Sequence, residues 1–174
     1  AALLAGLAEQ AGARLLAVER RPHRARLVAQ AVAGTADVVV ADARSPVLQA
    51  AAADRVLVDV PCTGLGALRR RPEARWRRVP DDLAALLPLQ RALLRSALDA
   101  ARPGGVVAYV TCSPHLAETT GVLDAVLGER RDVERMDARP MLPGVPELGA
   151  GPDVRLWPHR HGTDAMYLAL LRRT

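Results

Sequence analysis

A chain of 174 residues and 18.6 kDa is long enough for one domain with its own core and too short for two domains of ordinary size. Half of its residues are hydrophobic and a quarter are charged, a balance that excludes a disordered chain, a collagen-like fibre and a repeat array. No apolar run of about 18 residues could cross a membrane, and the first residues carry no basic leader or cleavage signature. We therefore expect a cytoplasmic protein without a membrane partner.

Short β-branched runs alternate with helical stretches, which is typical of βα units around a mainly parallel sheet. In chain order the sequence predicts a helix at 1–10, a strand at 14–19, a helix at 22–33, strands at 38–42 and 55–60, a helix at 88–101, a strand at 105–111, a helix at 116–129, and strands at 133–137 and 165–171. Pro88 suits the first turn of its helix, and Pro-Gly-Gly at 103–105 ends it. The stretch 139–163 is rich in Pro and Gly and predicts a long loop over the sheet edge.

The start of the chain lacks one expected feature. A doubly wound nucleotide-binding sheet carries a glycine-rich turn after its first strand, and about 20 residues later an acid that binds ribose hydroxyls. Glu19 fits that acid, because it closes the run Arg-Leu-Leu-Ala-Val-Glu. Counting back places the glycine turn at or before residue 1, so the sequence is expected to begin after the first strand and phosphate-type loop.

The net charge of +5 is concentrated in residues 69–78, which we call the arginine segment. This segment holds six Arg against one acid, Glu73, and the rest of the chain is neutral with 18 Arg against 18 acids. Such a focus predicts a positive patch suited to a polyanion such as nucleic acid, although a solvated Arg face would look the same. The patch members we expect to contact RNA are Arg69, Arg70, Arg71, Arg75 and Arg77.

The chain has two cysteines, and each follows a predicted strand. Cys62 follows Val-Leu-Val-Asp-Val-Pro, and Cys112 follows Val-Val-Ala-Tyr-Val-Thr. Carboxyl ends of parallel strands open onto one crevice, so both thiols are predicted to face one site. The alternatives are a disulfide, disfavoured in a reducing cytosol, and two small buried apolar residues.

The neighbours of the cysteines favour a site. Asp59 lies three residues before Cys62 and could bind a ring nitrogen or an exocyclic amine, while Gly64 and Gly66 could let backbone approach a ligand closely. Asp42 ends the strand Val-Val-Val-Ala-Asp, where it could hold an adenine amine or be an ordinary Asp at the start of a loop.

Three segments resemble a known family. Asp-Val-Pro-Cys-Thr-Gly-Leu-Gly at 59–66, followed by Leu-Arg-Arg-Arg-Pro at 68–72 and Trp-Arg at 76–77, resembles the fourth motif of the Sun (RsmB-like) RNA cytosine-5 methyltransferases. Val-Thr-Cys-Ser at 110–113 is similar to their sixth motif, and Leu-Trp-Pro-His-Arg-His-Gly-Thr-Asp at 156–164 to their C-terminal signature. Both cysteine motifs in this order, together with the Arg-Pro stretch at 69–72 and the His-Gly-Thr-Asp ending at 161–164, are specific, and the match covers nearly the whole chain.

This resemblance implies a Rossmann-like α/β class I methyltransferase sheet with helices on both faces, S-adenosylmethionine as cofactor, and residues 1–174 as the C-terminal part of that one domain. It implies that Cys112 is the nucleophile and that Cys62 assists product release. Glu19 would bind the ribose, Asp42 the adenine side, and Asp59 would lie between the methyl donor and the target base. The family's first strand normally lies between the second and the fourth strand and joins two half-sheets, so without it we expect two separate sheets, poor stability, weak cofactor binding and an inactive fragment. The chain departs from the family at Ala165, where Gly is usual, and at Tyr167, where Phe is common.

The chemistry explains these residue types. Carbon 5 of cytosine is a poor nucleophile until a thiolate adds to carbon 6. This addition requires a thiol of lowered pKa, and we expect surrounding Arg side chains and the cationic methyl donor to lower it. The base must leave its stack to reach the thiols, so we expect a structured RNA, most plausibly ribosomal, as partner. Four aromatic residues are too few for stacking of many bases, so electrostatics should dominate binding.

Two rival hypotheses remain open at this point. One is a non-catalytic RNA-binding or assembly module with the same fold, which would need no thiols. The other is a cysteine hydrolase, with His115 as the base for Cys112. We expect no metal, because His159 and His161 have no third and fourth ligand at matching spacing and are better explained as loop anchors. The sequence leaves the oligomeric state open.

Overall fold

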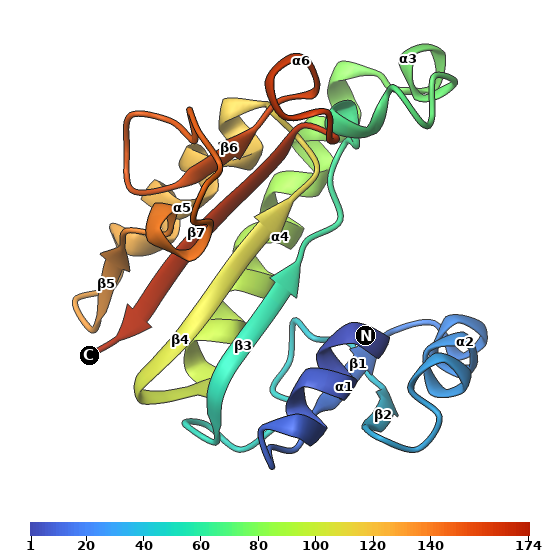
Figure 1. Cartoon of the computed structure of the whole chain (residues 1–174), viewed down its shortest axis with the longest axis vertical. Coiled ribbons are helices and arrows are strands. Elements are labelled where there is room, and N and C mark those ends of the chain that lie inside the picture. The colour runs from blue at the N-terminus through green and yellow to red at the C-terminus, as the bar shows by residue number, and fades with distance from the viewer. The chain divides into compact units, whose positions relative to one another are not determined.

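The computed structural model describes all 174 residues and divides into two compact units, residues 1–47 and 48–174. We describe each by itself, and Figure 1 labels their elements. None of the helices combines the length and the apolar character needed to cross a bilayer. The expectation that 1–174 is part of one domain stays a prediction.

The first unit contains two helix–strand pairs. In chain order these are α1 (Ala2–Gln10), β1 (Leu16–Glu19), α2 (Pro22–Val32) and β2 (Asp37–Val40). The two strands pair in parallel, with Glu19 opposite Val40. Pro22 occupies the first turn of α2, where its missing N–H costs no hydrogen bond. All four predicted elements are confirmed within about two residues at each end.

The second unit is built on a five-stranded sheet with the order β3-β4-β7-β5, and β6 pairs with β7. Its strands are β3 (Ala53–Asp59), β4 (Ala101–Thr111), β5 (Val133–Met136), β6 (Val154–Leu156) and β7 (Met166–Arg173). β3 and β4 are parallel, and β7 is antiparallel to β4, β5 and β6, so every strand except β7 runs in one direction. The carboxyl ends of β3 and β4 therefore lie at the same end of the sheet (Figure 1). The strands of the two units form separate sheets, as expected.

The main core lies between this sheet and two helices, α4 (Pro80–Ala100) and α5 (Thr120–Leu127), which pack against one another. Leu94 and Leu98 of α4 and Leu123 of α5 are fully buried. They pack with Tyr109 of β4 and Leu171 of β7 in this core. The apolar side chains of α4 therefore form its core-facing stripe.

Two predicted helices have different bounds in the structure. α4 begins at Pro80, so Pro88 lies inside the helix and not in its first turn. The true start has Pro80 at the first position, and the Asp82 carboxylate accepts a hydrogen bond from Val79 N at 3.2 Å. The predicted helix 116–129 is divided by Thr119, whose backbone is not helical, into the short 3-10 helix η2 (Leu116–Glu118) and α5.

The prediction of a long loop at 139–163 is wrong in part. This stretch contains η3 (Arg139–Met141), β6 and α6 (Pro158–His161), and two further short elements, η1 (Leu65–Ala67) and α3 (Ala74–Arg77), precede α4. β6 forms because its three residues pair with β7. Its Val154 also packs with Ala138 and Leu148 in a small second core. Such pairing is tertiary, and three residues carry no readable period of their own.

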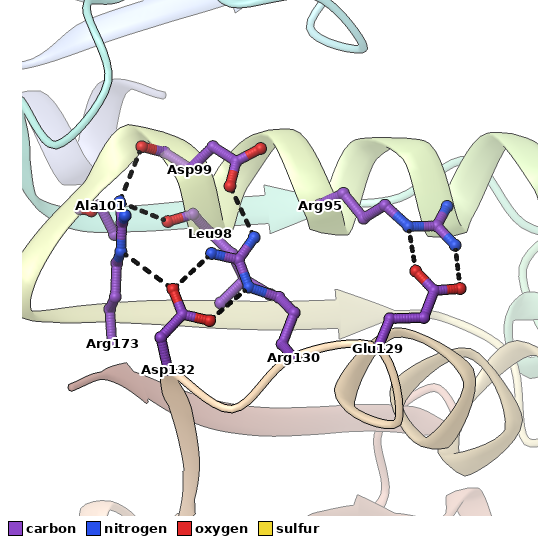
Figure 2. A network of polar contacts seen from close by, with 8 residues as sticks. All are labelled: Arg95, Leu98, Asp99, Ala101, Glu129, Arg130, Asp132 and Arg173. Atoms are coloured by element: carbon purple, nitrogen blue, oxygen red, sulfur yellow. Dashed lines mark hydrogen bonds and ion pairs between the residues drawn. The ribbon is translucent and has the colours of Figure 1, made fainter.

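At the end of the sheet opposite to the carboxyl ends of β3 and β4, arginines close the C-terminus of α4 (Figure 2). Arg173 donates to the carbonyls of Asp99 and Ala101 at 3.1 and 2.8 Å, and its Nε lies 3.4 Å from Asp132. Arg130 binds both Asp132 and Asp99. The last carbonyls of a helix need such donors, and positive charge there is favourable.

We expect Arg173→Met to lower the free energy of unfolding by about 1–2 kcal/mol, because the carbonyls of Asp99 and Ala101 lose their donor. The neighbouring Arg172 is a matched control, since it makes one exposed ion pair with Glu134. Arg172→Met should cost at most about 1 kcal/mol. Urea unfolding of both variants tests this, and equal midpoints would contradict it.

Candidate active site

The two thiols meet at the carboxyl ends of β3 and β4. Cys62 Sγ and Cys112 Sγ lie 3.4 Å apart, and both residues are half-buried. The backbone holds them in place, because Val60 N donates to Val110 O at 3.1 Å and extends the β3–β4 pairing toward the cysteines. The predicted convergence is confirmed, and the separation is well beyond the length of about 2.05 Å of a disulfide.

Gly66 locks the Cys62 loop against the Cys112 loop. Its N–H donates to Cys112 O, and its carbonyl accepts from Ala165 N, both at 2.9 Å. A Cβ at this position would lie 2.1 Å from Ala165 O and 2.6 Å from Cys112 O. Gly66 is thus required by protein backbone on both sides, whereas the sequence predicted a close approach to a ligand. Gly64 serves a different purpose, since its φ of +74° is a left-handed conformation.

A buried polar cluster lies behind the thiols, centred on Glu118. Its carboxylate accepts hydrogen bonds from Thr63 N at 2.8 Å, Thr63 Oγ1 at 2.5 Å and Gln90 Nε2 at 2.9 Å. Gln90 Nε2 also donates to Pro61 O, and Tyr109 donates its hydroxyl to Glu118 O at 2.7 Å. Burial raises the pKa of Glu118, but hydrogen bonds from Ser113, Thr63 and Gln90 outweigh it and hold the pKa below the ordinary value. The cluster joins both cysteine loops to α4.

Sequence reasoning missed this cluster. Glu118 follows a strand end by seven residues in His-Leu-Ala-Glu-Thr-Thr, which is typical of an exposed turn. Gln90 lies on a helix whose polar residues are ordinarily solvated. The one usable signal is that Gln90 falls among the apolar positions Leu87, Leu94 and Leu98, on the core-facing stripe of α4.

The thiol pair shares its protons unequally. The Cys112 S–H and the Gly64 N–H donate to Cys62, and this lowers the pKa of Cys62 to about 6 despite burial. The same contact with Cys62, with burial and the charges of Cys62 and Asp59, raises the pKa of Cys112. The predicted lowering of the Cys112 pKa by arginines is therefore wrong for this state of the site. The pair as a whole loses its first proton easily and its second with difficulty.

This inequality predicts the pH dependence of alkylation. Because the pKa of Cys62 is lowered, its thiolate forms as pH rises through about 6, and the rate with iodoacetamide should rise between about pH 5 and 7. Cys112→Ala removes the S–H donor and should move this rise to higher pH. Cys62→Ser should abolish the low-pH phase. A single inflexion in the wild type near the ordinary thiol value of about 8.5 would contradict the prediction.

Asp59 stands at the carboxyl end of β3, close enough that its charge contributes to raising the pKa of Cys112. The side chain reaches solvent, yet surrounding protein displaces part of its hydration and raises its own pKa. A carboxyl group of raised pKa beside the thiols can donate a proton to a ring nitrogen and take it back. The structure thus places Asp59, Cys62 and Cys112 together.

The arginine segment divides into two groups. Arg70 forms a two-pronged ion pair with the buried carboxylate of Asp164, and Arg69 donates to Gly162 O and lies 3.5 Å from Asp164. Arg78 donates to Thr63 O at 2.9 Å. These three brace the Cys62 loop and the C-terminal signature. The second group is exposed and makes no ion pair or side-chain hydrogen bond: Arg71, Arg75 and Arg77.

The histidines serve the backbone. His161 Nδ1 accepts from Trp157 N at 2.8 Å, so its Nε2 carries the proton and donates to Pro146 O at 3.0 Å. His161 is therefore a loop anchor, as predicted. His115 Nδ1 accepts from Ala117 N at 3.1 Å, within its own loop, and contacts neither thiol, which removes the support for a cysteine hydrolase. No group of three or more His, Cys, Asp or Glu side chains is arranged to hold a metal ion.

Glu19 and Asp42 lie near the carboxyl ends of β1 and β2 in the first unit. Glu19 accepts from Arg21 N at 2.8 Å and keeps its other oxygen free of protein hydrogen bonds. Asp42 is held by the Arg44 side chain and backbone, which lower its pKa to about 2. The two are close through the pairing of β1 with β2. Carboxylates at adjoining strand ends suit ribose hydroxyls and an exocyclic amine, although Arg44 competes for Asp42.

Known proteins resemble this chain over nearly all of its length. The model of the family described as 16S rRNA methyltransferase RsmB/F matches residues 1–172. A putative methyltransferase of Mycobacterium tuberculosis (strain H37Rv) is 59% identical over 174 residues, covering 99% of this chain and 38% of that protein. Ribosomal RNA small subunit methyltransferase B of Thermus thermophilus is 40% identical over 121 residues, covering 70% of this chain and 29% of that protein.

The solved structures agree with the sequence comparison. NSun6 from Pyrococcus horikoshii, crystallised with SFG, has a TM-score of 0.78 and 28% identity, covering 92% of this chain and 41% of that one. The Rossmann-like methyltransferase fold expected from the motifs is thereby confirmed. The chain spans about two fifths of the first relative's length. By the match over residues 1–172, the chain belongs to the RsmB/F family of 16S rRNA methyltransferases.

Proposed function

We propose that this chain carries the catalytic thiols of an RNA cytosine-5 methyltransferase that acts on ribosomal RNA in the cytoplasm. The observation that supports it most is the thiol pair, with Cys62 and Cys112 Sγ atoms 3.4 Å apart beside Asp59 at the carboxyl ends of two parallel strands. Non-catalytic binding needs no such pair. The Thermus thermophilus relative, named a ribosomal RNA small subunit methyltransferase, supports the substrate class.

The proposed reaction begins with proton transfer inside the pair. The Cys62 thiolate, which forms readily because the pKa of Cys62 is lowered to about 6, takes the proton of Cys112 as the Cys112 sulfur forms its bond to carbon 6 of cytosine. Asp59 donates a proton to ring nitrogen 3, which neutralises the charge that addition places there. The electron pair released toward carbon 5 makes this carbon nucleophilic.

The reverse proton movements release the product. Once carbon 5 carries its methyl group, its proton leaves to solvent and that electron pair restores the double bond to carbon 6. The bond between carbon 6 and Cys112 breaks, Cys62 returns a proton to the departing sulfur, and Asp59 takes back the proton of nitrogen 3. One proton is released per methyl group transferred, so the pair and Asp59 end as they began.

S-adenosylmethionine supplies the electrophilic methyl group in this proposal. Within the first unit, Glu19 and Asp42 are carboxylates of the kind that bind ribose hydroxyls and an exocyclic amine. Within the second unit, Asp59 beside the thiols is the carboxylate proposed to act on the target base. The structural relative crystallised with SFG, an analogue of S-adenosylmethionine, supports this assignment. The exposed Arg71, Arg75 and Arg77 would contact phosphates, with Arg69 and Arg70 shaping the loop from which they project.

Methyl transfer to RNA by the complete gene product tests the function. With S-adenosylmethionine labelled at the methyl group, small-subunit ribosomal RNA should gain label that digestion releases as 5-methylcytidine. Cys112→Ser should reduce the rate at least about 10³-fold, since a hydroxyl cannot replace the thiolate nucleophile. Intact RNA binding without any transfer by the wild type would instead favour a non-catalytic binding module.

A further inference from the structure

One large aromatic side chain outside the thiol site has no partner. Trp76 lies on α3, between the Cys62 loop and α4, and 77% of its surface is exposed. The two aromatic pairs of the chain involve other rings, and no side-chain hydrogen bond uses the Trp76 indole. Burying an indole is strongly favourable, so a ring held in water on a short ordered turn indicates a surface that binds something.

The charges around this ring select the class of ligand. Arg75 and Arg77 flank Trp76 in the chain, Arg71 precedes them, and none of the three has an acidic partner. The one acid of the arginine segment, Glu73, makes no ion pair with them. A flat apolar ring among unpaired guanidinium groups matches a ligand with phosphates and aromatic bases, and exposed base faces occur in unpaired strands.

This surface is tied to the thiol site. Arg78, directly after α3, donates to Thr63 O at 2.9 Å, one residue from Cys62. At the other end of the segment, Arg70 and Arg69 bind Asp164 and Gly162. Figure 1 shows α3 near α6, beyond the carboxyl ends of β3 and β4. A nucleotide held at α3 would therefore lie beside the base that enters the thiol site.

We propose that Trp76 stacks on an unpaired RNA base adjacent to the target cytosine, while Arg71, Arg75 and Arg77 bind the phosphates on either side. This inference rests on the proposed function and adds to it a specificity determinant. It selects RNA whose target lies in a loop, bulge or opened strand, because a paired base offers no free face. One stacked base is compatible with a chain that has few aromatic residues.

The test uses the fluorescence of Trp76 in the complete gene product with Trp157→Phe, which removes the only other tryptophan of this chain. Any tryptophan elsewhere in the gene product is also replaced by Phe. The probes are an RNA hairpin with an unpaired cytosine-containing loop and a fully paired RNA duplex with the same number of phosphates. We expect the hairpin to quench Trp76 and the duplex to leave it unchanged. Trp76→Leu should weaken hairpin binding about tenfold, Trp76→Phe should restore most of it, and duplex binding should change little.

The outcomes separate this inference from the function on which it rests. If Trp76→Leu binds the hairpin as tightly as the wild type, or weakens hairpin and duplex equally, stacking at Trp76 is overturned while methyl transfer stands. Absence of quenching by the hairpin, with methyl transfer intact, overturns it as well. If the wild type neither binds nor methylates RNA, the proposed function itself fails. Arg75→Gln and Arg77→Gln should weaken the binding of both the hairpin and the duplex, because both RNAs carry phosphates.

Discussion

Cys62→Ala should turn the protein from a catalyst into a covalent trap. Alanine removes the Cys62 hydrogen bond and charge that raise the pKa of Cys112, so addition of Cys112 to the cytosine ring should still occur. The acid that returns a proton to the departing Cys112 sulfur is lost, so release should slow. General acid–base groups contribute about 10²–10⁴-fold, and we expect turnover to fall by that factor.

The measurement is a denaturing gel of Cys62→Ala incubated with RNA and S-adenosylmethionine. A slower band containing both protein and RNA should accumulate, and it should be absent from the wild type at steady state. The matched control is the double variant Cys62→Ala, Cys112→Ala, which should give no adduct. An adduct that forms in Cys112→Ala and requires Cys62 would reverse the two assignments.

Of the glycine-to-alanine substitutions in the second unit, Gly66→Ala is expected to destabilise the fold the most. The added Cβ would lie 2.1 Å from Ala165 O and 2.6 Å from Cys112 O, and backbone cannot rotate away as a side chain can. We expect a loss of about 3 kcal/mol in the free energy of unfolding, at the upper end for over-packed positions. Methyl transfer should fall further than stability explains, since the displaced backbone carries Cys112.

Gly151→Ala provides the control for that substitution. A Cβ at Gly151 meets nothing within 4 Å, and its φ is not in the left-handed region, so its effect should stay within about 0.5 kcal/mol. Urea unfolding and the methyl-transfer rate, measured on both variants, give the comparison. If Gly66→Ala has the same stability and methyl-transfer rate as Gly151→Ala, the tight contact of residue 66 with the Ala165 and Cys112 carbonyls is contradicted.

Two departures from the family pattern have structural explanations. Ala165 is almost fully buried, and it interacts with Gly66 through its backbone N–H, which any residue other than proline provides. Tyr167 uses the hydroxyl that a Phe would lack, because it donates to the buried Asp153 at 2.5 Å and accepts from Arg135 at 3.1 Å. Its ring packs edge-to-face on Tyr109, 6.3 Å between centroids. Neither departure disturbs the thiol site.

The sequence by itself determined the elements with a strong local period and the placement of the thiols. β3 and β4 both carry β-branched runs, and an Asp or Thr at the carboxyl end of a parallel strand reaches the shared crevice whatever the rest of the fold does. This is why Cys62, Cys112 and Asp59 could be brought together in advance. The arginine segment was equally evident, because a local charge excess needs no fold to be counted.

Only the tertiary structure decided which polar residues serve the fold. Arg70 and Arg77 are equivalent in the sequence, yet Asp164, 94 residues after Arg70, binds Arg70 and leaves Arg77 free. Glu118 is buried because Thr63 and Gln90 donate to it across 55 and 28 residues. The pKa values of the thiols depend on a contact of 3.4 Å between residues 50 apart. Such contacts join residues that are far apart in the sequence, so local hydrophobic periodicity and secondary-structure propensity do not predict them.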